Sequence, residues 1–317
     1  MRATEAARNR AALALRYSEW EKARVAVRLR NQNTLGFGEH VELLLAASDA
    51  ETLAQGSLRG ERLFVAGIGY RAAAYTLTDK PRFFGTDGGE LNRAKFERQG
   101  LSLALQTSLE RWGLLEAGAR FGRVKTVAQA AVPVPAASDT VSLLFAGLTL
   151  DTLDNLRWPS AGGRLAAAAE WSLEGLGATH PYWRLRVEGR LGRATFGGAA
   201  LQLDGLLGLS GEELPVYDHF RLGGPTLVPG YRFEELKGAQ ALAAALSLRY
   251  PLLGSLSLVA RGGAGNAFLD PEPLAIGDLR WGAGIGVVYP SRIGPISLEF
   301  GLRDDGKTLL SLGVGWY

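Results

Sequence analysis

Hydrophobic and polar residues alternate with a period of two through most of the chain, most clearly at its C-terminal end. One face there carries Ile296, Leu298, Phe300 and Leu302, and the other carries Ser297, Glu299, Gly301 and Arg303. After the turn residues 304–307, the alternation resumes with Leu310, Leu312, Val314 and Trp316. A period of two predicts β-strands, and the Asp-Asp-Gly-Lys turn between the two runs predicts a hairpin.

The same pattern predicts sixteen strands along the chain. They lie within residues 13–17, 23–30, 41–45, 53–59, 64–70, 101–105, 115–122, 144–150, 165–171, 183–191, 201–209, 242–250, 256–260, 281–287, 296–302 and 310–316. The strand at 53–59 has the weakest alternation of the set. The short first strand and the glycines Gly313 and Gly315 in the last one predict weak pairing between these two strands.

The connections between the predicted strands fall into two sets. Those after odd-numbered strands include the long segments 78–92, 126–139, 212–238 and 269–277, whereas 110–113, 251–255 and 290–294, after even-numbered strands, are tight. Antiparallel strands place the two sets on opposite rims, which is typical of outer-membrane barrels and has no reason in a soluble sandwich. We therefore predict an all-β fold, a 16-stranded antiparallel transmembrane β-barrel, with residues 1–317 as one domain.

The charged positions indicate which face of each strand meets lipid. In the strand 183–191, Trp183, Leu185, Val187 and Leu191 share one face, while Arg184, Arg186, Glu188 and Arg190 share the other. An Arg facing lipid at mid-depth costs about 2–4 kcal/mol, so the charged faces are predicted to line a lumen. Aromatic residues near strand ends suit the two membrane interfaces, although a soluble core would also use them.

Composition excludes several classes of protein. No window approaches the roughly 18 consecutive apolar residues of a membrane helix, and with no Cys there is neither a disulfide framework nor a Cys metal site. The 29 Arg and six Lys are scattered through strands, with a net charge of +3, so nucleic-acid binding is not predicted. The first ten residues lack the apolar core of a signal peptide, so we expect either a removed signal or a longer chain with N-terminal periplasmic or passenger domains.

The sequence offers no convincing catalytic site. A patatin-like hydrolase needs a Gly-x-Ser-x-Gly elbow, but Ser160 has Trp158 two residues before it, and Asp87 stands alone in a loop. The three histidines, His40, His180 and His219, are widely dispersed. We therefore predict no catalytic residue, metal or cofactor in this segment.

Four motifs resemble a known family. They are Leu150–Gly163, Tyr217–Gly238, Gly265–Phe268 and the aromatic end Trp316-Tyr317. Together they resemble outer-membrane barrels of the BamA/TamA type, the bacterial surface antigen superfamily, over nearly the whole chain. The runs VYDHFRLGG, PGYRFEEL and GPISLEFG are most similar to the C-terminal barrel of patatin-like phospholipase autotransporters of type Vd.

The resemblance implies that the loop 212–238 folds into the lumen and carries a family motif. The motif positions here are Phe220, Arg221, Leu222, Gly223, Gly224, Pro229, Gly230, Tyr231 and Arg232. Because Pro229 stands where the family motif has Arg, we expect Arg232 or Arg221 to pair with Glu299 or Asp204 of the wall, near Arg261. The other interpretation is an extracellular loop with solvated charges.

The remaining implications concern the turn motif and the function. Asp151, Asp154, Asn155 and Pro159 are expected to hold a structural turn by side-chain to backbone bonds and a fixed φ.

The resemblance implies a barrel in a Gram-negative-type outer membrane that anchors, translocates or helps insert polypeptides. Any phospholipase activity would then belong to a passenger domain. The alternatives are an assembly-factor barrel and an anion-preferring porin. The partners expected are outer-membrane lipid, a translocated or inserted polypeptide, and a second copy in a homodimer.

Overall fold

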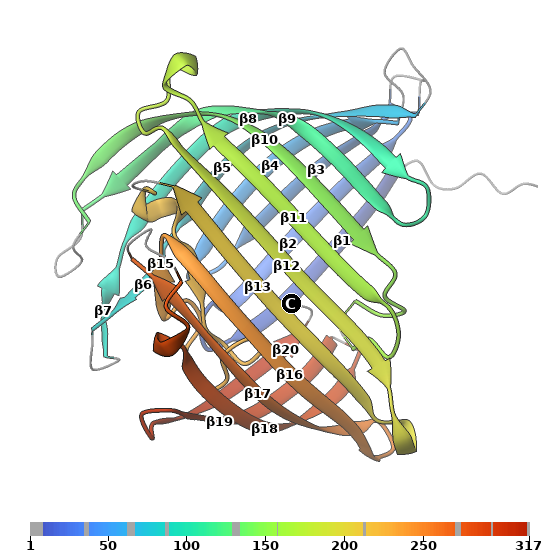
Figure 1. Ribbon diagram of the computed structural model, residues 1–317. Helices are drawn as coiled ribbons and strands as arrows, with labels where there is room; N and C mark the ends of the chain where they lie inside the picture. Colours follow the sequence, from blue (N-terminus) through green and yellow to red (C-terminus); the bar gives the residue numbers. More distant parts are fainter. Residues whose placement is uncertain are drawn as a thin grey trace, which may run out of the picture.

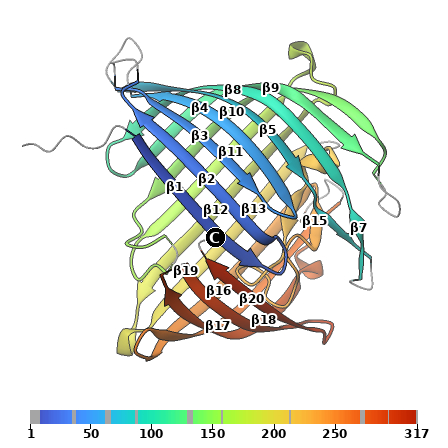
Figure 2. The same ribbon diagram turned by 180° about the vertical axis from the view of Figure 1, so that it is seen from behind.

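The computed structural model is a closed antiparallel barrel (Figures 1 and 2), and it describes residues 9–34, 38–61, 67–85, 89–128, 134–156, 158–211, 214–269, 274–292 and 294–315. In these residues sixteen strands form the wall, each hydrogen-bonded to the next in chain order. The prediction of a 16-stranded barrel is confirmed.

The wall strands in order are β1 (Asn9–Ser18), β2 (Lys22–Gln32), β3 (His40–Ala47), β4 (Glu51–Gly60), β5 (Ile68–Asp79), β8 (Lys95–Leu109), β9 (Gly113–Val127), β10 (Ala137–Asp151), β11 (Gly163–Ser172), β12 (Tyr182–Ala194), β13 (Ala200–Gly211), β16 (Gln240–Leu253), β17 (Leu256–Phe268), β18 (Arg280–Ser291), β19 (Gly294–Arg303) and β20 (Thr308–Gly315).

Two short hairpins lie outside the wall, on the rim that carries the long connections. They are β6 (Arg82–Phe84) with β7 (Glu90–Arg93), and β14 (Phe220–Leu222) with β15 (Leu236–Gly238). Four single-turn 3₁₀ helices complete the described structure: η1 (Glu174–Leu176), η2 (Phe196–Gly198), η3 (Val216–Asp218) and η4 (Ile276–Asp278). Within the described residues, no helix has the length and apolar character needed to cross a membrane.

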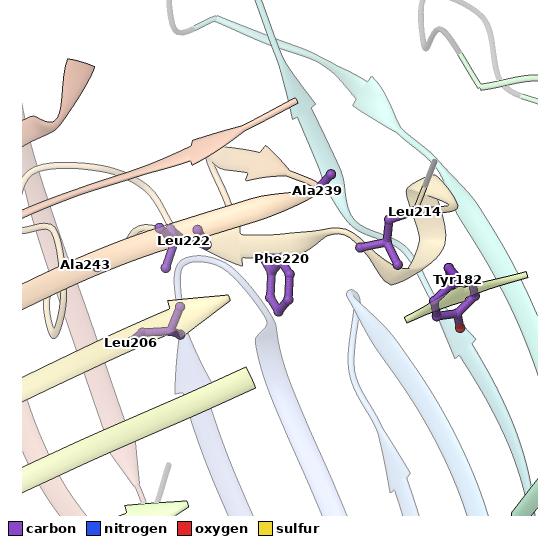
Figure 3. Packing of buried hydrophobic residues seen from close by; sticks show 8 residues of the cluster. Tyr182, Leu206, Leu214, Phe220, Leu222, Ala239 and Ala243 are labelled. Carbon is purple, nitrogen blue, oxygen red and sulfur yellow. The ribbon is translucent and has the colours of Figure 1, made fainter. Parts of the chain in front are cut away.

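The two faces of the wall differ as the alternation predicts. On β8, Leu101, Leu103 and Leu105 are 50–59% exposed, whereas Ser102 and Gln106 on the other face are 6% exposed. The apolar side chains therefore point out of the barrel and the polar ones point in. The buried apolar side chains gather instead where a loop packs against the inner wall, as Phe220, Leu222 and Leu206 do in Figure 3.

The structure confirms one uncertain strand prediction and corrects another. The strand predicted at 53–59, which has the weakest alternation, is confirmed as β4. The fifth strand was predicted around residues 64–70 but runs from Ile68 to Asp79, and residues 62–66 lie outside the described part. The reason is that Arg71–Thr76 places small alanines on both faces, so the strand has little contrast between apolar and polar positions.

Candidate functional site: the lumen loop and the seam

The connection between β13 and β16 lies against the inner wall, and its described residues, 214–239, are called the lumen loop below. Phe220 and Leu222 of β14 are 3% and 2% exposed. Phe220 sits over Gly208 of β13, where an added Cβ would come within 2.6 Å of its ring. Figure 3 shows these side chains with Leu206 and Ala243 from the neighbouring wall strands. The glycine on β13 therefore makes room for the loop inside the barrel.

The tip of the lumen loop rests on glycines of β18 and β19. A Cβ at Gly282 would lie 1.8 Å from the carbonyl oxygen of Pro229, and one at Gly301 would lie 2.4 Å from the nitrogen of Gly230. Both glycines face inward, because Trp281 and Phe300 beside them are exposed on the outer surface. The backbone of the tip thus touches the backbone of the wall, which only glycine permits at these positions.

Tyr231 follows the tip and is anchored to the turn between β19 and β20. Its hydroxyl donates a hydrogen bond to the Asp304 carboxylate, and the Arg303 guanidinium lies 4.0 Å from its ring centroid. Burial raises the pKa of Tyr231, and the Asp304 carboxylate raises it further. Arg303 also pairs with Glu235 at 2.6 Å. This corner of the loop is therefore fixed by stacking, a hydrogen bond and an ion pair together.

The predicted ion pair of Arg221 with Glu299 or Asp204 is wrong. Arg221 pairs with Asp79 at the end of β5, at 2.6 Å, and with Glu234 of the loop, at 3.2 Å. The Arg232 guanidinium lies 5.6 Å from the Phe84 ring centroid. Arg221 lies at the rim that carries the long connections, so it meets rim residues rather than Glu299 or Asp204 deeper in the lumen.

The two lumen carboxylates have wall partners instead. Asp204 is 2.6 Å from Arg190, its direct cross-strand neighbour. Glu299 is 3.4 Å from Arg261, and it is reached across Gly284 of β18, which has no side chain in the way. The wall therefore supplies a counter-charge to both carboxylates, from the adjacent strand for Asp204 and from across β18 for Glu299, and Pro229 introduces no cation to compete for them.

A buried carboxylate that the sequence analysis did not single out, Asp218, attaches the loop to the opposite wall. It pairs with Arg98 of β8 at 3.0 Å, accepts a hydrogen bond from the Tyr182 hydroxyl at 2.6 Å, and its carbonyl accepts from Arg184 at 2.9 Å. Burial alone would raise the pKa of Asp218, but Arg184 and Arg98 outweigh it and lower the pKa to about 2. The only sequence signal was the Asp in the Tyr-Asp-His-Phe run, which alternation leaves unassigned.

From the other rim, the connection between β10 and β11 also enters the lumen. Its described residues, 152–156 and 158–162, are called the inward turn below. Asp154 accepts hydrogen bonds from the backbone N–H groups of Ser160 and Ala161 at 2.9 and 3.0 Å, and Asn155 accepts from that of Trp158 at 3.1 Å. The predicted side-chain to backbone bonds of this motif are therefore present. The hydrogen bond from the Ser160 hydroxyl is the main reason that the pKa of Asp154 falls to about 2.

The inward turn meets lumen arginines as well as its own backbone. The Trp158 ring centroid lies 5.9 Å from the Arg249 guanidinium and 5.6 Å from that of Arg261. Pro159 is fully buried, against Gly192 of β12. Arg261 also donates to the carbonyl of Pro225 in the lumen loop, at 3.4 Å, so it touches both insertions.

A cavity of about 360 Å³ remains between the two insertions and the inner face of β20. Its lining includes Trp20, Trp158, Arg261, Phe233 and Ser311. The described residues contain no group of three or more His, Cys, Asp or Glu side chains that could hold a metal ion. The cavity is therefore a partly charged, partly aromatic space behind the last strand.

The barrel closes where β1 meets β20, and this junction is called the seam below. In the described residues it consists of three pairs, Arg16 with Gly315, Tyr17 with Val314 and Ser18 with Gly313. By contrast, β1 and β2 pair continuously from Asn9–Asn31 to Ser18–Lys22. Trp316 and Tyr317, the predicted C-terminal aromatics, lie outside the described residues. The few pairs between β1 and β20 in the described residues agree with the predicted weak pairing, but β1 itself, at ten residues, is not the short strand predicted from the sequence.

Taken together, a closed 16-stranded barrel with a loop inside its lumen and a short seam defines a class of barrels typical of Gram-negative outer membranes. The Omp85 superfamily domain matches residues 87–315 of this sequence. The chain belongs to the Omp85 superfamily, and the predicted BamA/TamA-type family is confirmed.

Solved structures agree on the fold. BamA from Haemophilus ducreyi, in a form lacking POTRA domains 1–3, superposes with a TM-score of 0.82 at 14% identity, over 98% of this chain and 70% of that one. CdiB from Acinetobacter baumannii gives 0.59 at 12% identity, over 96% and 58%, and CdiB from Escherichia coli gives 0.63 at 14%, over 98% and 63%. This chain thus spans less than two thirds of either CdiB structure. No curated protein sequence matches the chain significantly.

Proposed function

We propose that this barrel resides in the outer membrane of a Gram-negative-type bacterium and passes polypeptides across or into that membrane by opening its seam. The observation that carries the proposal is the seam, which has three pairs among the residues that the structure describes. Each backbone hydrogen bond contributes only about 1 kcal/mol net, so this junction costs far less to open than any neighbouring pair of wall strands. A polypeptide could then add to a freed strand edge by main-chain hydrogen bonding.

The charges of the lumen favour this proposal over an anion-preferring porin. Three wall arginines that would attract anions are matched by carboxylates: Arg190 by Asp204, Arg184 by Glu170 and Arg261 by Glu299. The lumen loop and the inward turn occupy the interior between these walls. Both features argue for a plugged barrel rather than an open diffusive pore.

The finer proposal is a translocator for a passenger of the patatin-like, type Vd kind. It is supported by the sequence resemblance of Val216–Gly224 and Gly294–Gly301 to such barrels. In this role the passenger precedes the barrel, and any phospholipase activity belongs to the passenger. The assembly-factor alternative differs in its client, which would be another barrel supplied as a separate chain.

A disulfide across the seam tests the proposal, because the chain contains no Cys of its own. Directly opposed residues on antiparallel strands bring their Cα atoms to about 4.5–5.5 Å, within reach of a disulfide. Ser18→Cys with Gly313→Cys should cross-link on oxidation, and a reporter passenger fused ahead of Asn9 should then no longer reach the cell surface, as measured by added protease. Reduction should restore surface display.

The matched control places Leu103→Cys with Ala119→Cys across the continuous β8–β9 ladder. Oxidation of this pair should leave display unchanged. Undiminished display from a fully cross-linked seam would contradict the proposal.

Adding an unfolded eight-stranded outer-membrane barrel to proteoliposomes distinguishes the two kinds of client. Faster folding of that probe, abolished by the seam disulfide, would favour the assembly-factor role.

A further inference from the structure

Five residues of the lumen loop, Tyr231–Glu235, contact the turns on both sides of the seam. On the C-terminal side, Tyr231 and Glu235 bind the β19–β20 turn through Asp304 and Arg303. On the N-terminal side, the Phe233 ring lies 5.8 Å from the Trp20 ring, centroid to centroid, and Trp20 belongs to the β1–β2 turn. The same short segment is thus attached to both strands of the weakest junction in the barrel.

The backbone of this segment explains how its side chains diverge. Arg232 and Glu235 close a turn, in which the backbone N–H of Glu235 donates to the Arg232 carbonyl at 3.2 Å and the Glu235 carboxylate accepts from the N–H of Arg232 at 2.8 Å. Glu234 adopts φ +57°, a left-handed conformation that is uncommon for a residue other than glycine. The turn therefore presents Phe233 away from Tyr231 and Glu235.

The glycine pair of the loop motif holds Phe233 in place. A Cβ at Gly224 would come within 2.7 Å of the Phe233 ring, and one at Gly223 would lie 2.1 Å from the Arg232 carbonyl oxygen. Both glycines have positive φ, at +120° for Gly223 and +90° for Gly224. The absence of side chains at the motif glycines thus leaves room for the Phe233 ring, which also lies near the Trp20 ring.

The β1–β2 turn connects Trp20 to the seam through an ion pair. Glu21, next to Trp20, is 2% exposed and pairs with Arg24 and with Arg16, and Arg16 is itself one of the three β1 residues that pair with β20. The Arg82 guanidinium donates to the carbonyl of Trp20 at 3.1 Å, which fixes the turn from the β6 side. A displacement of Trp20 would therefore move the end of β1 with it.

We infer that residues 231–235 are a clasp that holds the seam shut from inside, with Phe233 and Trp20 as the residues that position β1 against β20. The inference rests on the proposed opening of the seam. It assigns to the lumen loop a role in setting the open fraction of the seam, beyond filling the lumen. Polypeptide passage would then require the Phe233–Trp20 contact to separate.

Distance measurements between spin labels test the clasp without any client. Leu15→Cys on β1 and Leu310→Cys on β20 are both more than half exposed on the outer face, so they accept labels without disturbing the lumen. In lipid, Phe233→Ala should enlarge the long-distance population of this pair by about 2- to 10-fold, the effect of losing one aromatic contact of ordinary strength. Trp20→Ala should do the same, and the double variant should add little to either.

Two controls make the result specific. Phe83→Ala removes a ring that lies 4.5 Å from the Lys237 ammonium, outside the clasp, and should leave the distances unchanged. Labels at Leu103→Cys and Leu115→Cys on the β8–β9 wall should not respond to any of these variants. Unchanged seam distances in both Phe233→Ala and Trp20→Ala would overturn the clasp, whatever the seam disulfide does to surface display. A wider seam in both, with display unaffected by that disulfide, would support the clasp and reject the polypeptide route.

Discussion

The β8–β9 wall and the seam are the two extremes of one barrel. The two wall strands pair without interruption from Lys95–Val127 to Leu109–Gly113, whereas β1 and β20 share three pairs in the described residues. The wall is held by its own ladder of hydrogen bonds. The seam gains much of its support from elsewhere, through side chains that reach it from the lumen loop.

The difference shows that the lumen loop joins the strong side of the barrel to the weak one. Asp218 fixes the start of the loop to Arg98 of β8, while Tyr231 and Glu235 fix its far part beside β20. Between them, Pro229 and Gly230 rest on the glycines of β18 and β19. Removing these attachments one at a time therefore measures how much the lumen loop contributes to the stability of the seam.

The largest effect is expected from Asp218→Asn. It leaves Arg98 without the Asp218 carboxylate and Arg184 with Glu170 alone, and removing one partner of a buried pair costs about 3–5 kcal/mol. The free energy of unfolding, measured by guanidinium titration in detergent micelles, should fall by that order. Asp305→Asn, a solvent-exposed carboxylate of the β19–β20 turn, is the matched control and should change it little.

The pH dependence of the free energy of unfolding is a second test of the contribution of Asp218 to stability. The pKa of Asp218 is lowered to about 2 in the folded protein from an ordinary value near 3.8. The stabilisation is therefore fully present above about pH 4 and is lost as the pH falls from there towards 2, with an amplitude of about 2 kcal/mol. Asp218→Asn should lack this decline, and an identical acid profile in the variant would show that other carboxylates cause it.

The sequence predicts the strands of the wall, but it predicts only some of the side-chain contacts inside the lumen. Alternation predicts the number of strands, and the position of each except β5, because lipid outside and a charged lumen inside impose opposite chemistry on neighbouring residues. The pairing of Arg190 with Asp204 follows from the same logic, since both point inward on adjacent strands. Arg221 with Asp79 joins residues far apart in sequence and depends on how the loop folds back, which no period encodes. Trp158 was likewise assigned to a plain turn because nothing local indicates that the turn enters the lumen.

A smaller effect is expected from lifting the loop off its seat beside the seam. Gly282→Val forces a Cβ into the Pro229 carbonyl, and overpacking of this kind costs about 1–3 kcal/mol. Protease cleavage within residues 225–233 should become faster, and the unfolding midpoint should fall. Gly262→Val on β17, where an added Cβ meets nothing within 4 Å, should leave both unchanged. Equal sensitivity of the two variants would mean that the loop does not depend on this seat.

The smallest effect concerns the inward turn, which closes the lumen from the opposite rim. Trp158→Ala removes the ring that lies against Arg249 and Arg261, and each such contact is worth about 0.5–2 kcal/mol. Single-channel recordings in a planar bilayer should change from small, flickering currents to larger ones that prefer anions, because two arginines are uncovered. Trp158→Phe keeps an aromatic face over both guanidinium groups and should retain most of the closure. If Trp158→Ala leaves the conductance unaltered, the lumen loop alone blocks the barrel, and the inward turn serves only as a structural turn.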